Sequence, residues 1–197
     1  MQLIHSLLLA LAFVTPAHSI RMAASERVTS IRPENFARVP LSSLDAAFAI
    51  EEASYPEDEA ATREKLQLRI EQAGDYFFGA SEGGELQGFV CGTLTKGDAL
   101  TEESMSVHEP DGTTLCIHSV VVREADRRRG LGGAMLKAYV AQVAGHSPVT
   151  SILLMCKKPL IGFYEAAGFE LLGQSPVVHG ADPWFDMRLL TDRLEGS

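Results

Sequence analysis

The residues whose types and spacing point most clearly to chemistry lie in one turn, at positions 127–133. Three consecutive arginines are followed there by Gly130, Gly132 and Gly133. The β-branched run 120–122 before the turn is typical of a buried strand, and the apolar spacing after it is typical of a helix. Glycine lets a backbone approach a ligand closely, and a helix N-terminus presents unpaired N–H groups and a positive dipole. The turn is therefore predicted to bind a phosphate-bearing group.

Two common phosphate-binding motifs do not fit this turn. A P-loop requires a Lys-Ser/Thr pair after its last glycine, and none follows here. The dinucleotide-binding fingerprint requires a third glycine at the position of Met135. What fits is Arg-x-x-Gly-x-Gly, from Arg127 to Gly132, between a strand and a helix. The alternative interpretation of so short a pattern is an arginine-rich surface turn.

A second motif lies downstream of the first. Residues 151–156 are typical of another buried strand, and after it come Phe163-Tyr164 and Gly168-Phe169 around a short helix. The two motifs, in this order and about thirty residues apart, resemble the signatures of the GNAT acetyltransferase superfamily. This resemblance implies an α/β domain of three layers, with a central mixed, mostly antiparallel sheet flanked by helices. It also implies acetyl-CoA as co-substrate and no metal.

A closer resemblance is to the arylalkylamine N-acetyltransferase branch of that superfamily. Residues 99–112 contain a Leu-Thr-x-Glu-Ser segment ahead of a strand that carries Cys116 and His118. In the branch this strand carries a His-x-His pair, so Cys116 departs from the pattern. The segment 51–61 is similar to non-vertebrate members, which accept a broader range of amines. The resemblance covers about residues 30–192.

Three residues are predicted to be catalytic. Acetyl transfer requires that the ammonium lose a proton, that the thioester oxyanion be stabilised and that the departing thiolate gain a proton. His118 is predicted to accept the first proton, because imidazole titrates near pH ~6.5. Cys116 shares its strand face and is expected to form a pocket wall and to relay protons weakly. The resemblance assigns Tyr164 as proton donor to the thiolate.

The predicted acetyl-CoA contacts come from the strand end and the turn. The backbone of 120–122 would pair with the pantetheine amides, and one of its N–H groups would hold the carbonyl oxygen. Arg127 is expected to steady the loop or to meet an outer phosphate. The full set is Val120, Val121, Val122, Arg127, Arg128, Arg129, Gly130, Leu131, Gly132 and Gly133. Pro56, Met155 and Trp184 match apolar positions of the amine pocket in the branch.

Several activities remain open at this point. The leading expectation is acetylation of small primary amines, with arylalkylamines of the serotonin and tryptamine type first. The acidic residues Glu51, Glu52, Glu57, Asp58 and Glu59 could instead favour polyamines, or form a solvated helix rim. A protein acetyltransferase acting on lysine or an N-terminus would share every CoA contact. Cys116 is the feature that favours a CoA-binding module without catalysis.

Composition narrows the class of protein. The 197 residues suffice for one domain, and 46% apolar with 22% charged residues is typical of a globular protein. The net charge of −9 disfavours nucleic acid as a partner, because binding it requires a basic face. Three cysteines without metal-ligand spacing imply no disulfide framework or zinc site and suit a reducing compartment. We expect a monomer without a stable membrane span.

The first 25 residues are set apart from the domain at 26–197. The apolar run 7–14 is too short to span a bilayer, and small residues stand at 17 and 19, where a signal peptidase cleaves. A signal peptide, a two-part organelle signal and a true start at Met22 all remain open. The location is therefore left as cytoplasmic, plastid or mitochondrial, with export through the secretory pathway as a further alternative.

Periodicity and turn residues predict the order of elements. Strands are expected at 28–31, 76–80, 86–95, 114–122 and 151–156, with two more between 169 and 190. Helices are expected from about 41 to 50, at 59–72, from about 130 to 144, and at 159–167. Residues 82–85 are predicted to form a hairpin turn.

Overall fold

The computed structural model describes residues 27–194 apart from positions 102, 105, 147 and 178–181. The predicted targeting segment, residues 1–25, lies outside the described residues. The strands are β1 (Phe36–Arg38), β2 (Phe77–Glu82), β3 (Glu85–Thr95), β4 (Thr114–Val122), β5 (Ser151–Lys157), β6 (Glu170–Gln174) and β7 (Trp184–Leu190). The helices are α1 (Leu44–Glu52), α2 (Arg63–Gln72), α3 (Leu131–His146) and α4 (Ile161–Glu165). Single 3₁₀ turns occupy Pro33–Asn35, Leu41–Ser43, Gly74–Tyr76, Glu124–Asp126, Lys158–Leu160 and Thr191–Leu194.

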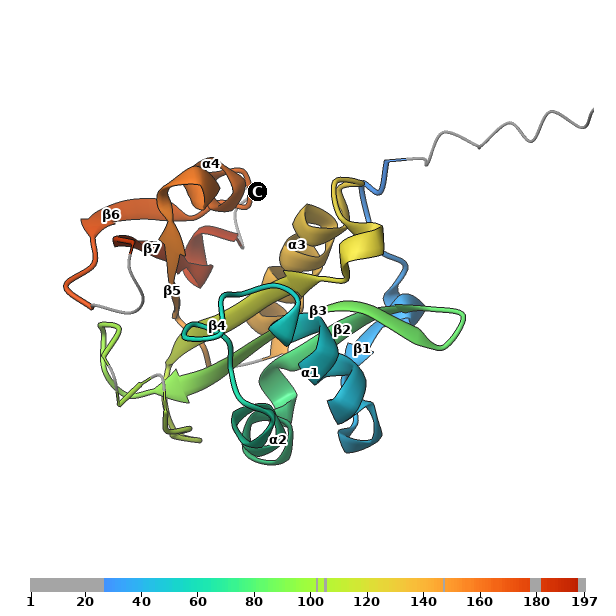
Figure 1. Ribbon diagram of the computed structural model, residues 1–197. Helices are drawn as coiled ribbons and strands as arrows, with labels where there is room; N and C mark the ends of the chain where they lie inside the picture. Colours follow the sequence, from blue (N-terminus) through green and yellow to red (C-terminus); the bar gives the residue numbers. More distant parts are fainter. Residues whose placement is uncertain (1–26, 102, 105, 147, 178–181, 195–197) are drawn as a thin grey trace, which may run out of the picture.

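The described strands form one mixed sheet in the order β1-β2-β3-β4-β5-β7-β6. Every neighbouring pair is antiparallel except β4 and β5, which run parallel. Helices α1 and α2 cover one face of the sheet, α3 covers the other, and α4 lies over β6 and β7 (Figure 1). The prediction of a three-layer α/β fold with a mostly antiparallel sheet is confirmed.

Each face of the sheet has its own apolar core. On the α3 face, Met135 and Tyr139 pack with Leu115 of β4 and are fully buried. On the opposite face, Ala47 of α1 and Leu66 of α2 pack against the strand side chains Phe77 and Phe89. Burying a large apolar side chain contributes about 1.5–3 kcal/mol. The two cores therefore fix β3 and β4, the central strands, between the helical layers.

One predicted strand is wrong. Residues 28–31 have no regular secondary structure, and the edge position beside β2 is taken by β1, where Phe36 pairs with Ala80. The backbone N–H of Val28 instead donates to the carbonyl oxygen of Arg129 at 2.7 Å. The segment therefore lies against the turn before α3, where it has no strand neighbour to pair with.

Two predicted helices are longer than the observed ones. Helix α2 begins at Arg63, because the Thr62 hydroxyl oxygen accepts the Lys65 N–H at 3.3 Å and caps the helix there. Helix α4 follows the 3₁₀ turn that contains Pro159 and ends before Gly168, whose positive φ of 96° is typical of a helix C-terminus. The predicted hairpin turn is confirmed, because Gly83 and Gly84 both have positive φ between β2 and β3.

Strand β4 contains a bulge that the sequence pattern did not show. Cys91 pairs with Ser119 and the next residue of β3, Gly92, pairs with Ile117, so the backbone of His118 is not opposite any residue of β3 in the strand register. A Cβ on Gly92 would lie 2.6 Å from the carbonyl oxygen of Cys116, which is why a glycine stands there. The extra residue reverses the alternation of side chains along the strand. Ile117 consequently packs in the α3 core, whereas Val121 packs in the α1/α2 core.

Candidate active site

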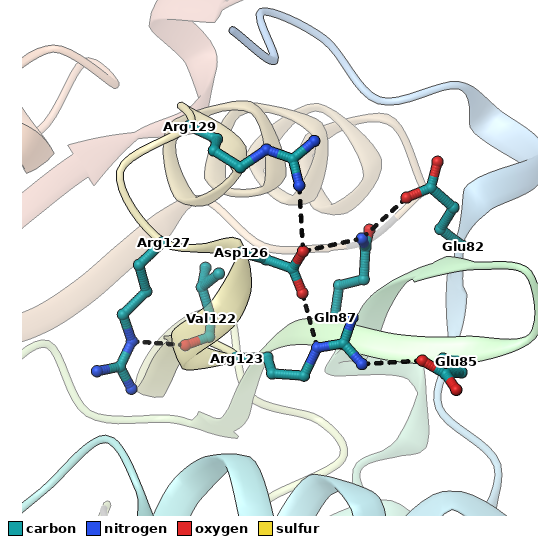
Figure 2. Close-up of polar contacts among 8 residues, drawn as sticks. All are labelled: Glu82, Glu85, Gln87, Val122, Arg123, Asp126, Arg127 and Arg129. Carbon is teal, nitrogen blue, oxygen red and sulfur yellow. Dashed lines mark hydrogen bonds and ion pairs between the residues drawn. The ribbon is translucent and has the colours of Figure 1, made fainter. Parts of the chain in front are cut away.

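The turn between β4 and α3 is built around a buried carboxylate, Asp126. Its oxygens accept hydrogen bonds from Arg123 Nε at 2.7 Å, Arg129 Nη1 at 3.3 Å and Gln87 Nε2 at 3.4 Å (Figure 2). The side chain of Asp126 is only 7% exposed. A buried carboxylate requires such donors, so Asp126 holds the turn against β3. The side chain of Arg129 is thereby directed to Asp126, which leaves the backbone of Arg129 for contact with a ligand.

Arg127 has a scaffolding role in the structure. Its Nε donates to the carbonyl oxygen of Val122 at 2.9 Å (Figure 2), and its Nη2 donates to the carbonyl of Ala53 at 3.1 Å and the hydroxyl of Ser54 at 3.0 Å. These bonds join the end of β4 to the segment after α1. Of the two roles expected for Arg127, the contacts correspond to steadying the loop.

Arg128 and Gly130 adopt unusual backbone conformations. Arg128 is exposed and has a positive φ of 63°, and Gly130 has a φ of 91°. A Cβ on Gly130 would lie 2.3 Å from the carbonyl oxygen of Val28, so the N-terminal segment passes directly against the turn. Helix α3 starts at Leu131, and the N–H groups of its first turn have no intrahelical acceptor. The turn thus presents backbone donors, a helix dipole and an exposed cation, which fits a phosphate-bearing group.

Strands β4 and β5 separate beside this turn. Their parallel ladder joins only Thr114–Cys116 to Ser151–Leu153. Beyond it, the two strands diverge, β5 towards α4 and β4 towards α3 (Figure 1), and the β4 backbone from His118 to Val122 has no pairing with β5. Backbone groups on such an edge can pair with an extended amide-containing ligand.

A cavity of about 540 Å³ lies at this opening. Its walls come from the end of α1 and the segment after it, from α2, and from β4, β5, α4 and the start of β7. Five of the predicted site residues line it: His118, Val120, Met155, Tyr164 and Trp184. Cys116, Val121, Val122 and Pro56 are outside the lining, and Pro56 is exposed to solvent.

The imidazole of His118 is held in one tautomer. Its Nε2 lies 2.7 Å from Thr93 Oγ1, and the hydroxyl of Thr93 donates to the carbonyl oxygen of Ser104 at 3.0 Å. Because that hydroxyl has a single proton, it must accept from Nε2–H. Nδ1 is then the unprotonated nitrogen, and it has no hydrogen-bond partner among the described residues.

The surroundings of His118 keep it neutral. Burial lowers the pKa of His118 well below its usual value, and the positive charges of Arg69 and Lys65 lower it further. Both cations belong to α2 and line the same cavity. A neutral imidazole with a bare Nδ1 is a proton acceptor at neutral pH.

Cys116 is buried away from the cavity. Its side chain is fully buried beside Leu100 and Leu153. Burial raises the pKa of the Cys116 thiol to about 11, with a smaller opposing effect of Ser104. At neutral pH the side chain is therefore a protonated thiol that lies beside Leu100 and Ser104.

Two tyrosines, Tyr55 and Tyr164, line the cavity. The ring of Tyr164 packs edge-on against Phe163 and Phe169, with centroid separations of 5.0 and 5.9 Å. Burial raises the pKa of Tyr164, so its hydroxyl keeps its proton at physiological pH. Burial also raises the pKa of Tyr55, whose hydroxyl interacts with the backbone of Val120. Tyr55 was not predicted as a site residue, since an isolated tyrosine before a proline gives no signal of this kind.

An ion pair closes one side of the cavity. Lys157 Nζ at the end of β5 lies 2.7 Å from Glu59 Oε1 and 4.0 Å from the ring centroid of Trp184. Glu59, on the segment before α2, and Trp184, at the start of β7, both line the cavity. The three side chains therefore join chain segments on opposite sides of the cavity. Of the five acidic residues noted above, Glu52 and Glu57 are exposed outside the lining.

The fold is shared with proteins of known structure. The loading GNATL domain of CurA from Lyngbya majuscula superposes with a TM-score of 0.73 at 13% identity, covering 81% of this chain and 98% of that one. The ribosomal-protein-S18-alanine N-acetyltransferase of Escherichia coli gives a TM-score of 0.61 at 17% identity, covering 79% of this chain and 92% of that one. Both define the class of fold as that of the GNAT domains.

Residues 44–169 match the acetyltransferase (GNAT) family, and the chain belongs to this family, whose members use acetyl-CoA. Serotonin N-acetyltransferase of Mesocricetus auratus is 32% identical over 107 residues, which are 54% of this chain and 52% of that protein. The chain thus spans about half the length of the curated relatives it matches. No helix among the described residues is both long and apolar enough to cross a membrane.

Proposed function

We propose that the protein transfers the acetyl group of acetyl-CoA to the amine of small primary amines, with arylalkylamines of the tryptamine type as the preferred class. The observation that carries the proposal is the pairing, in one cavity, of a neutral histidine with a bare Nδ1 and a protonated buried tyrosine. The partial similarity to serotonin N-acetyltransferases supports the substrate class.

Acetyl-CoA would be held by the turn and by the splayed strand. The first turn of α3, with the backbone of Arg128 to Gly133, would receive the pyrophosphate, and exposed Arg128 would add a positive charge. The β4 backbone beyond Cys116 would pair with the pantetheine amides. This assignment gives the side chains of Arg127 and Arg129 structural roles, because both are engaged within the protein.

Proton transfer in the reaction would use two side chains. A proton moves from the substrate ammonium to Nδ1 of His118, and the free amine attacks the thioester carbon. In the structure the Val120 backbone interacts with the Tyr55 hydroxyl. Once that hydroxyl moves away, the Val120 N–H would stabilise the oxyanion. When the C–S bond breaks, the hydroxyl proton of Tyr164 passes to the departing thiolate, and the second proton lost by the attacking nitrogen restores the Tyr164 hydroxyl.

An aromatic amine is the first candidate substrate for the cavity, and a polyamine is the second. Trp184 and Met155 give the cavity apolar walls suited to an aromatic amine. Asp58 and Glu59 also line it and would suit a polycation, although Glu59 is already paired with Lys157. This pairing makes the polyamine the less favoured substrate.

A substrate panel tests the proposal. CoA release from acetyl-CoA is measured for the full chain with tryptamine, serotonin, phenylethylamine, spermine and a lysine-containing peptide. The largest kcat/KM is expected for the arylethylamines. A larger value for spermine or the peptide would remove the arylalkylamine assignment, and CoA binding without turnover of any amine would support a module without catalysis.

A further inference from the structure

Glu51, in the last turn of α1, is a buried carboxylate with one oxygen in use and one bare. Oε1 accepts the backbone N–H of Ala61 at 3.1 Å and the hydroxyl of Ser119 at 3.0 Å. Oε2 has no hydrogen-bond partner among the described residues, although Glu51 is only 2% exposed. Glu51 lines the cavity, and Ser119 adjoins His118 on β4.

The fold itself does not supply the missing partner of Oε2. Arg69 of α2 is close enough to favour the ionised form of Glu51, but its Nη1 also has no partner among the described residues. Leaving a buried carboxylate oxygen without a donor costs free energy. A residue kept in that state at the wall of a cavity is typical of a ligand site.

We propose that Oε2 of Glu51 binds the ammonium group of the amine substrate and thereby determines selectivity for protonated amines. This inference rests on the proposed function, since it assigns a residue to the amine in the same cavity. An ammonium has three N–H donors. One would go to Oε2 of Glu51 and a second to the bare Nδ1 of His118, so that the nitrogen is held beside the atom that removes its proton.

The electrostatics of the cavity single out Glu51 among its carboxylates. Glu59 is paired with Lys157 at 2.7 Å, and Asp58 is exposed, where solvent screens its charge. Burial raises the pKa of Glu51, and the donors Ala61 and Ser119, with Arg69, partly offset this effect. Two donors to Oε1 match an ionised carboxylate, which accepts only. A bound ammonium would stabilise that ionised state further.

The test compares a charged ligand with its neutral isostere. Tryptamine and tryptophol differ by an ammonium in place of a hydroxyl, and their affinities for the CoA-loaded full chain are measured by calorimetry. Glu51→Gln removes the charge but keeps an acceptor oxygen for Ala61 and Ser119. The wild-type protein should prefer tryptamine by at least about tenfold, and the variant should bind both ligands about equally. Glu52→Gln, on the exposed face of the same helix, should leave the preference unchanged.

Each further outcome is decisive. Retention of the preference in Glu51→Gln, equal weakening of both ligands, or no preference in the wild-type protein would overturn the inference. Glu51→Asp, which keeps the charge on a shorter side chain, should retain part of the preference, and CoA affinity reports the folding of each variant. Acetylation of tryptamine is measured in parallel. A charge-selective wild-type protein without turnover would overturn the proposed function alone. Turnover of tryptamine together with a preference for tryptamine that survives in Glu51→Gln would overturn this inference alone.

Discussion

Nε2 of His118 lies 2.7 Å from Oγ1 of Thr93, and this contact determines which imidazole nitrogen accepts a proton. The Thr93 hydroxyl proton is given to Ser104, so Nε2 must carry the proton and Nδ1 must be bare. A threonine on β3 thereby prepares a histidine on β4 for its role in the cavity.

Replacing Thr93 with valine should lower kcat. The variant keeps the shape of the side chain but removes the acceptor for Nε2–H, so the imidazole loses its fixed tautomer. We expect a decrease of about tenfold, corresponding to one lost hydrogen bond, with little change in acetyl-CoA affinity. Thr93→Ser should restore the rate. The control is Thr95→Val, on the same strand as Thr93, which removes a hydroxyl that donates to Glu109. An equal loss of kcat in that variant would contradict the assignment.

The pH dependence of kcat should reflect a neutral His118. Because burial, Arg69 and Lys65 lower its pKa below the usual ~6.5, kcat at saturating amine should decline only at pH values below that range. The unfolded chain takes up this proton near pH ~6.5 and the folded chain does not. The His118 contribution to stability is therefore lost as pH falls from ~6.5 towards the lowered pKa. Chemical denaturation of the wild-type and His118→Gln proteins at several pH values measures how the free energy of unfolding of each depends on pH. The same pH dependence in both proteins would contradict the assignment.

Removing the hydroxyl of Tyr164 should slow the reaction without weakening CoA binding. Tyr164→Phe keeps the ring packing with Phe163 and Phe169, and loss of an acid catalyst lowers kcat by about 10²-fold or more. Tyr139→Phe is a matched control, because that buried hydroxyl donates to the carbonyl of Tyr76 at 2.9 Å on the α3 side. It should cost about 1 kcal/mol of stability and leave kcat unchanged. If both variants lose activity equally, Tyr164 is structural.

The N-terminal segment should affect acetyl-CoA affinity through the carbonyl of Arg129. Val28→Pro removes the N–H that donates to that carbonyl at 2.7 Å, and the turn loses one of the contacts that orient its backbone. A rise of about three- to tenfold in the KM for acetyl-CoA is expected from one hydrogen bond, with the KM for the amine unchanged. Val28→Ala keeps the N–H and should leave both values close to wild type. An equal rise in both KM values would contradict a local effect on the turn.

The sequence predicted the order of elements and the turn between β4 and α3 because those features depend on local patterns. The run 114–122 was assigned as a strand with the observed bounds, since five of its nine residues are β-branched and favour a strand. The prediction of a strand at 28–31 was wrong because local strand propensity does not show whether the edge of a sheet is free to pair. Phe36–Arg38 occupies that edge instead.

The finer features of the site depend on contacts between distant residues. Simple alternation placed Cys116 and His118 on one face, but it could not show the bulge at His118, which is set by the close approach of Gly92 to β4. Asp126 appears in the sequence as one more acidic residue, and only its contacts with Arg123 and Arg129 show that it holds the turn (Figure 2). Thr93 likewise gives no sequence signal, and Glu51 stood out only as one of five acidic residues, because the partners of both lie on other elements.

The most direct test of a neutral His118 as the base for acetyl transfer is the rate of N-acetyltryptamine formation by wild-type and His118→Gln proteins at pH 7. The glutamine side chain can still donate to Thr93, but it offers no basic nitrogen to the amine. The account predicts acetylation by the wild-type protein and a rate at least about 10²-fold lower in the variant, with CoA affinity unchanged. Equal rates in the two proteins, or no acetylated product from the wild-type protein, would contradict it.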